Sequence, residues 1–119
     1  MFDFESFVPE LVKEFKQRFR ITWADEAEEK LIETYIRSGN SYLKSTALGC
    51  DIDYTSDLYA KDLLYSYVLY ARSDAISGYR EAYSGELLRL RIQYQHSLLR
   101  TERENEQQEQ LEGGDDSDD

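Results

Sequence analysis

Residues 55–76, TSDLYAKDLLYSYVLYARSDAI, decide the fold, because their apolar side chains recur at the three- and four-residue spacings of an α-helix. A broad face carries Tyr59, Ala60, Leu63, Leu64, Tyr67, Val68, Tyr70, Ala71 and Ala75. A narrower second stripe carries Leu58, Tyr65, Leu69 and Ile76, and polar residues separate it from the broad face. A helix that is apolar on two faces must bury both. We therefore predict that the broad face packs in the core and that the second stripe contacts another protein.

Two amphipathic helices are predicted before this segment. The first covers residues 6–19, with Ser6 as its cap and Pro9 in its first turn. The second begins at Thr22, which is expected to cap the amide of Asp25, and its apolar face carries Ala24, Leu31, Ile32, Tyr35, Ile36, Tyr42 and Leu43. Gly39 in this helix is compatible with a close helix crossing, a local break or no special role. Residues 47–54 lose the periodicity and predict a loop, after which Thr55 or Ser56 caps the central helix.

The segment after Gly78 carries two competing patterns. Leu88, Leu90, Ile92 and Tyr94 alternate with polar residues as in a strand, whereas Leu87, Leu88, Arg91, Tyr94, Gln95 and Leu98 fit a helix. We expect a short helix, capped by Ser84, whose end is extended. The predicted fold class is therefore all-α, a small bundle of three to four helices with a partly extended C-terminal segment and an acidic tail.

The charge of the chain is concentrated at its C-terminal end. The net charge is -11, and residues 101–119 carry nine acidic residues against one arginine, a net of -8. The first 100 residues therefore carry only -3. Leu111 is the only apolar residue of the tail, so this segment cannot bury enough surface to fold alone. We predict a helical domain over 1–100 and an acidic tail over 101–119 that is disordered unless a partner orders it.

The residues that usually carry catalysis are sparse. The chain has one histidine, His96, one cysteine, Cys50, and no glycine-rich phosphate-binding motif. No segment approaches the ~20 apolar residues that span a bilayer, and the N-terminal residues lack the pattern of a signal peptide. We expect a protein that is not an enzyme, holds no metal or cofactor, and is neither exported nor inserted in a membrane.

Three features occur in a characteristic order: the helix TWADEAEEKLIETYIRSGNSYLKSTAL, a loop and second helix SDLYAKDLLYSYVLYARSDA, and the segment YSGELLRLRIQYQ. This layout, over about residues 21–95, resembles the small helical head-tail connector (head-completion adaptor) proteins of long-tailed bacteriophages. The pattern Ser-x-Glu-Leu-Leu-x-Leu-Arg at 84–91 is its most specific part. The acidic tail is not part of the family pattern.

The resemblance implies a structural protein of the virion neck, assembled in the host cytoplasm. Its subunits would form a homo-oligomeric ring, typically of twelve, between the portal protein and the next connector or tail-completion protein. DNA would pass through the ring without sequence-specific binding. Such a ring joins one patch of a subunit to a different patch of its neighbour. The candidate contact residues are Leu58, Tyr65, Leu69 and Ile76 from the second stripe, and Leu88, Leu90, Arg91 and Ile92 from the later segment.

Two other function classes are compatible with the sequence. An acidic DNA mimic that blocks a nucleic-acid enzyme would explain the net charge, although such a mimic needs carboxylates spread over a folded surface. An enzyme subunit or a cytoplasmic helical regulatory protein is also compatible with the sequence, because fold alone does not determine function.

Overall fold

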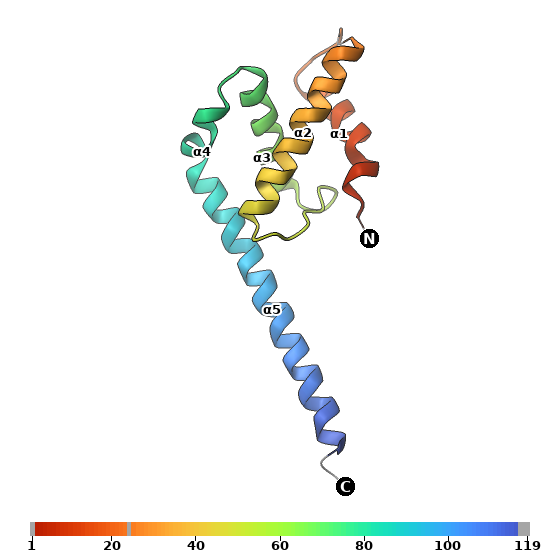
Figure 1. Ribbon diagram of the computed structural model, residues 1–119, viewed down its shortest axis with the longest axis vertical. Helices are drawn as coiled ribbons and strands as arrows, with labels where there is room; N and C mark the ends of the chain where they lie inside the picture. The colour runs from red at the N-terminus through yellow and green to blue at the C-terminus, as the bar shows by residue number, and fades with distance from the viewer. Residues whose placement is uncertain (1, 24, 117–119) are drawn as a thin grey trace.

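The computed structural model describes residues 2–23 and 25–116, and side-chain surroundings as far as Gln108. The described residues confirm the all-α fold class and contain no strand. Figure 1 shows a bundle from which one long helix projects. Its elements are α1 (Phe4–Arg18), α2 (Glu26–Thr46), α3 (Leu58–Arg72), the short 3₁₀ turn η1 (Ile76–Gly78), α4 (Tyr79–Ala82) and α5 (Ser84–Asp116).

The bundle is organised around the crossing of α2 and α3. Ile32, Ile36 and Leu43 of α2 are buried there, as are four residues of the broad face of α3, namely Ala60, Leu63, Leu64 and Val68. Gly39 is also buried at the crossing, where a Cβ atom would lie 2.7 Å from Leu64 Cδ1 and 2.9 Å from Tyr67 Cδ1. Of the three roles open to Gly39, the close helix crossing is therefore the correct one.

Helix α1 packs on α2 and on one side of α3. Its buried residues are Val8, Leu11, Val12 and Phe15. Two ion pairs join it to α3, Lys61 Nζ to Glu14 Oε1 at 2.9 Å and Arg18 Nη1 to Asp62 Oδ1 at 2.7 Å. The helix begins at Phe4 and not at Ser6, so Pro9 lies in its second turn and not in the first.

The caps of the next two helices differ from the predicted ones because aspartates stand closer to each helix start. Asp25, not Thr22, caps α2 by accepting from the Glu28 amide at 2.8 Å. Asp57, not Thr55 or Ser56, caps α3 by accepting from the Ala60 amide at 3.0 Å. Thr55 is engaged in the preceding turn, where its amide donates to Asp53 Oδ1 at 2.9 Å. The predicted central helix also ends earlier, at Arg72, and Ile76 lies in η1.

A cluster of tyrosine rings holds the chain reversal after α3. Tyr79 is buried, and its hydroxyl donates to the carbonyl oxygen of Leu63 at 2.7 Å. Its ring lies 4.9–5.8 Å from the rings of four other tyrosines, Tyr42, Tyr67, Tyr70 and Tyr83. Burial raises the pKa of Tyr79 above its ordinary value, so the phenol stays protonated and remains a donor.

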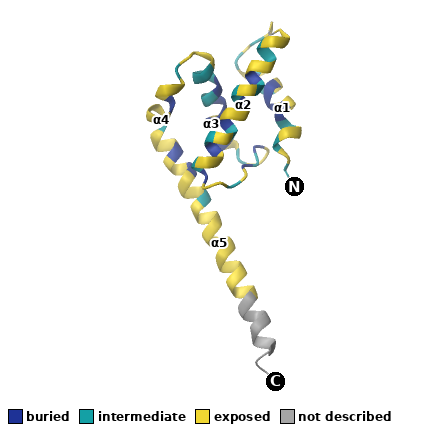
Figure 2. Cartoon of the chain, viewed as in Figure 1, coloured by how far each residue is buried: buried dark blue, intermediate teal, exposed yellow. Residues whose placement is uncertain are grey.

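Helix α5 starts on the bundle and then leaves it. Leu87 and Leu90 are buried and Tyr94 is half-buried, whereas all residues from Gln95 to Gln108 are exposed (Figure 2). The expectation that the end of this segment is extended is wrong. Of the two patterns that the sequence left open for residues 87–95, the helix is the correct one, because these residues are helical throughout. The backbone of residues 101–116 continues the same helix, so the predicted domain boundary at residue 100 falls inside α5.

Candidate interaction surface

The middle of the second stripe of α3 is covered by the chain's own first helix. Tyr65 is only 1% exposed, its ring centroid lies 5.7 Å from that of Phe15, and its hydroxyl donates to the Leu11 carbonyl oxygen at 3.4 Å. The prediction that Tyr65 belongs to an intermolecular contact is therefore wrong. Its cover is α1, for which the sequence had indicated an apolar face without naming a partner.

The other members of the stripe differ in burial. Leu69 is half-buried and packs against the core, whereas Leu58 and Ile76, at the two ends of the stripe, are exposed. Leu58 is 58% exposed and is the first residue of α3. The stripe thus presents two separate apolar side chains to solvent in place of the continuous surface expected from the sequence.

The four candidate residues of the later segment also divide. Leu90 is fully buried, so its prediction as a contact residue is wrong. The strand-like alternation had placed Leu88, Leu90 and Ile92 on one side, but in a helix Leu90 points with Leu87 and Tyr94 toward the bundle. Leu88, Arg91 and Ile92 are exposed on the outer side of α5.

The outer side of α5 carries more apolar surface than the sequence had indicated. Leu98 and Leu99 lie beyond the bundle and are 40% and 46% exposed. Leu99 follows Leu88 and Ile92 on one face of the helix, because the spacings of four and seven residues are helical repeats. The signal in the sequence was the continuation of this spacing past residue 95, where the expected extended end obscured it.

Asp57 joins α3 to α5. Besides capping α3 with one carboxylate oxygen, Asp57 accepts with Oδ2 from the Tyr94 hydroxyl at 2.8 Å and from Gln93 Nε2 at 3.1 Å. Nearby, the Tyr59 hydroxyl donates to the Glu86 carbonyl oxygen at 3.3 Å, and the guanidinium of Arg89 lies 5.9 Å from the centre of the Tyr59 ring. This junction fixes the direction in which α5 leaves the bundle.

A groove lies on the side of α5 that faces α2. Its volume is about 630 Å³, and its lining combines apolar, hydroxyl and basic side chains: Tyr42, Ser45, Thr46, Leu48, Arg80, Ser84, Leu87, Leu88 and Arg91. Leu48 and Leu88 are exposed, and Arg80 and Arg91 add two positive charges beside them. The groove is therefore suited to an acidic segment with some apolar character.

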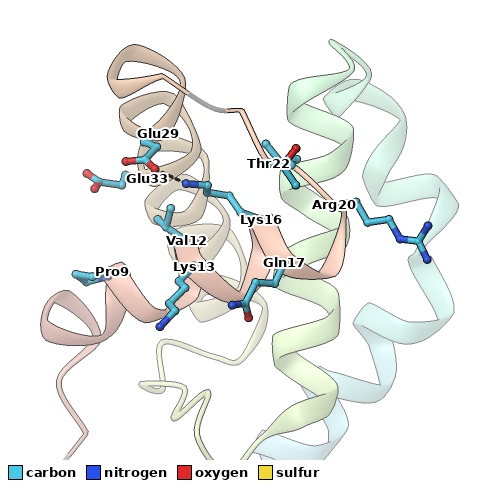
Figure 3. A pocket seen from close by; sticks show the side chains of 10 residues that line it. Pro9, Val12, Lys13, Lys16, Gln17, Arg20, Thr22, Glu29 and Glu33 are labelled. Atoms are coloured by element: carbon cyan, nitrogen blue, oxygen red, sulfur yellow. Dashed lines mark hydrogen bonds and ion pairs between the residues drawn. The ribbon is translucent and has the colours of Figure 1, made fainter.

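A second hollow, of about 720 Å³, lies between α1 and the start of α2 (Figure 3). Lys13, Lys16 and Arg20 stand on its α1 side, and Glu29 and Glu33 on its α2 side. Lys16 forms an ion pair with Glu29 across it. The two signs of charge thus partly neutralise each other, and the hollow has no dominant charge with which to select a ligand.

The histidine and the cysteine of the chain lie on different elements. His96 is exposed on α5 and Cys50 is half-buried in the loop before α3. Within the described residues, no three His, Cys, Asp or Glu side chains form a cluster that could hold a metal ion. No helix in the described part of the chain has both the length and the hydropathy needed to cross a membrane. The exposed apolar residues of α3 and α5 and the adjoining groove are therefore the candidate functional surface.

Comparison of the chain with protein-family models, with curated proteins and with solved structures found no match in any of the three.

Proposed function

We propose that this chain is a structural, non-enzymatic protein of a tailed-phage virion, a head-tail connector subunit that forms a ring beneath the portal. The ring, of twelve subunits by the family resemblance, would stand in the neck and contact the portal protein on one side. The next connector or tail-completion protein would bind on the other, and DNA would pass through the middle. Assembly would take place in the host cytoplasm. The ring would hold no cofactor and contact no membrane.

The observation that supports this proposal is a helical subunit with exposed apolar residues on two different sides. Leu58 lies at the α3–α5 junction, next to Asp57, which bonds to Gln93 and Tyr94. Leu88 and Ile92 lie elsewhere around α5, and Leu88 borders the α2 groove. A closed ring needs two different patches of this kind, because its contacts are heterologous. The proposed seam is Leu58 and Ile76 of one subunit against Leu88, Arg91 and Ile92 of the next.

The DNA-mimic alternative has less support from the charges of the bundle. Several bundle carboxylates already form ion pairs with basic residues of another helix: Glu5 with Arg37, Glu14 with Lys61, Glu28 with Arg72 and Asp62 with Arg18. A mimic of the phosphate backbone needs carboxylates that remain free to meet a basic partner. The paired carboxylates instead contribute to holding α1, α2 and α3 together.

The proposal predicts that a portal protein is encoded beside this chain, and its test is ring assembly on that portal protein. We expect the full chain to add a ring to the portal, measured by native mass spectrometry and electron microscopy. Leu58→Asp should prevent the ring while leaving the circular dichroism spectrum unchanged, because the side chain is exposed. Leu31→Asp is the matched control, since Leu31 is an exposed leucine on α2 outside the seam. Failure of the unmodified chain to bind the portal, or unchanged assembly of Leu58→Asp, would refute the assignment.

A further inference from the structure

The outer face of α5 has a two-part pattern. Residues 88, 92, 95, 99, 102 and 106 follow one another at alternating spacings of four and three, so they form one line along the helix. The half near the bundle carries Leu88, Ile92 and Leu99, with Leu98 beside them, and the far half carries Glu102 and Glu106. All of these residues are exposed. Arg91 borders the apolar half.

We propose that α5 pairs in antiparallel orientation with α5 of a second copy of this chain, and that the acidic end of each helix lies along the other copy's groove. With the contact centred on the two exposed leucines, Leu98 faces the partner's Leu99. In an antiparallel pair the numbers of two residues that lie opposite each other, one from each copy, have a constant sum, which here is 197. Arg91 then lies opposite the partner's Glu106, and Gln95 lies opposite the partner's Glu102. The pair is isologous, so each of these contacts occurs twice.

The charges select the antiparallel orientation. In a parallel pair at equal register, Arg91 would face the partner's Arg91, and Glu102 and Glu106 would face the partner's Glu102 and Glu106. Like charges directly opposite each other are unfavourable, and here four carboxylates would gather in two turns. The antiparallel arrangement replaces these repulsions with Arg91–Glu106 attraction at both ends of the apolar centre.

The groove provides a binding place for the rest of the partner's helix. Beyond Glu106 the sequence continues with Glu109 and Glu112, and the backbone stays helical to Asp116. At the proposed register residues 109 and 112 lie opposite residues 88 and 85 of the partner. These positions fall between the partner's Arg91 and Arg80, neither of which forms an ion pair within the described residues. The groove also presents the exposed side chains of Leu48 and Leu88.

The acidic end of α5 cannot reach the groove of its own chain. The helix is continuous from Ser84 to Asp116 and points away from the bundle (Figure 1). At 1.5 Å per residue, Glu106 lies about 22 Å along the axis from Arg91 of the same chain. Only a second copy in reversed orientation brings the acidic half beside the basic groove.

This inference goes beyond the proposed ring and does not depend on it. The antiparallel pair covers Leu88, Arg91 and Ile92, which also belong to the proposed seam, so the pair and the ring exclude each other. The free chain would be a dimer, and assembly on a portal would begin by separating its two copies. Leu99 belongs to the pair alone and Leu58 to the ring alone. A substitution at Leu99 therefore tests the pair, and a substitution at Leu58 tests the ring, so failure of one proposal can be distinguished from failure of the other.

The first test measures the mass of the free full chain by sedimentation and light scattering. We expect twice the monomer mass of 14.0 kDa. Leu99→Asp should raise the dissociation constant more than about 100-fold, because each copy loses a central apolar contact and gains a charge there. Ser97→Asp is the matched control, because it adds the same charge at an exposed position on the opposite side of α5. A monomeric chain at every concentration up to about 1 mM, or equal effects of the two variants, would overturn the proposal.

The second test examines orientation and register. Arg91→Glu and Glu106→Arg should each weaken the dimer about 10-fold or more, and the double variant should restore it. In a Cys50→Ser background, mixing Gln95→Cys and Glu102→Cys chains should give a disulfide between the two variants. A Gln95→Cys chain that links preferentially to itself would indicate a parallel pair and overturn the proposal, as would a double variant that stays monomeric.

Discussion

Substitution of Gly39 by alanine tests the close crossing of α2 and α3. The added Cβ atom would lie 2.7 Å from Leu64 Cδ1 and 2.9 Å from Tyr67 Cδ1, both shorter than carbon atoms tolerate without a shift. Leu64 is fully buried, and the ring of Tyr67 lies against the rings of Tyr42 and Tyr79. Neither neighbour can therefore move away without disturbing its own contacts.

Two opposing effects determine the size of the change in stability. Alanine is favoured over glycine in a helix interior by about 1 kcal/mol. Overpacking a filled core costs about 1–3 kcal/mol. We therefore expect Gly39→Ala to lower the free energy of unfolding by roughly 0–2 kcal/mol. Gly85→Ala in the first turn of α5 is the control, because an added Cβ there meets nothing within 4 Å, and it should raise stability by up to about 1 kcal/mol.

The assay is urea unfolding followed by circular dichroism, with the two variants compared at equal protein concentration. The expected difference between them is up to about 3 kcal/mol, with Gly39→Ala the less stable. Gly39→Val should be less stable still, because its branched side chain brings two more carbon atoms into the same contact. If Gly39→Ala stabilised the chain as much as Gly85→Ala, the α2–α3 crossing would not be closely packed and the reasoning would be refuted.

Three further predictions concern Asp57 and the buried tyrosines. Asp57→Ala should lower the free energy of unfolding by about 2–4 kcal/mol, because it removes a helix cap and hydrogen bonds to a charged acceptor. Tyr94→Phe removes only one of these hydrogen bonds and should cost about 1 kcal/mol. Equal losses of the two variants in urea unfolding would contradict the role of Asp57 as the junction of α3 and α5. Tyr65→Ala, a core substitution, should lower the free energy of unfolding by about 3–5 kcal/mol, and Leu58→Ala should lower it by less than about 0.5 kcal/mol. The reverse order would contradict the burial of Tyr65. Burial raises the pKa of Tyr54, Tyr65 and Tyr79 above the ordinary 10.0. The contribution of these tyrosines to stability is therefore complete below pH 10 and falls as the pH rises above 10. Urea midpoints that stay constant from pH 9 to 11 would contradict this prediction.

The periodicity of the sequence predicted the helical class and the first three helices. Residues at the centre of the broad face of α3, such as Leu64 and Val68, are buried as expected. The helix starts were predicted less well, because several residues in a row at each start could act as a cap. Asp57 became the cap of α3 since Thr55 is held by Asp53 in the turn before it.

Helix α5 was harder to predict because it has different surroundings along its length. Near the bundle, buried Leu90 lies between exposed Arg89 and Arg91, and this order imitates the alternation of a strand. Farther on, the residues TERENEQQEQLE are too polar to bury, but glutamate, glutamine and arginine are good helix formers. A helix already nucleated on the bundle extends into such residues at little cost, since nucleation is the costly step.

The second stripe of α3 illustrates what periodicity alone can establish. A stripe indicates that a surface needs a cover, and the cover can be part of the same chain or another protein. For Tyr65 the cover is α1, and the two unpartnered faces indicated by the sequence cover each other. For Leu98 and Leu99 the situation differs, because both lie on the part of α5 where every residue from Gln95 to Gln108 is exposed. Within the described residues neither leucine packs against the hydrophobic core, and the antiparallel pair proposed above would cover both with a second copy. There each leucine lies opposite the other leucine of the partner, while the acidic half of the partner's helix lies along the groove.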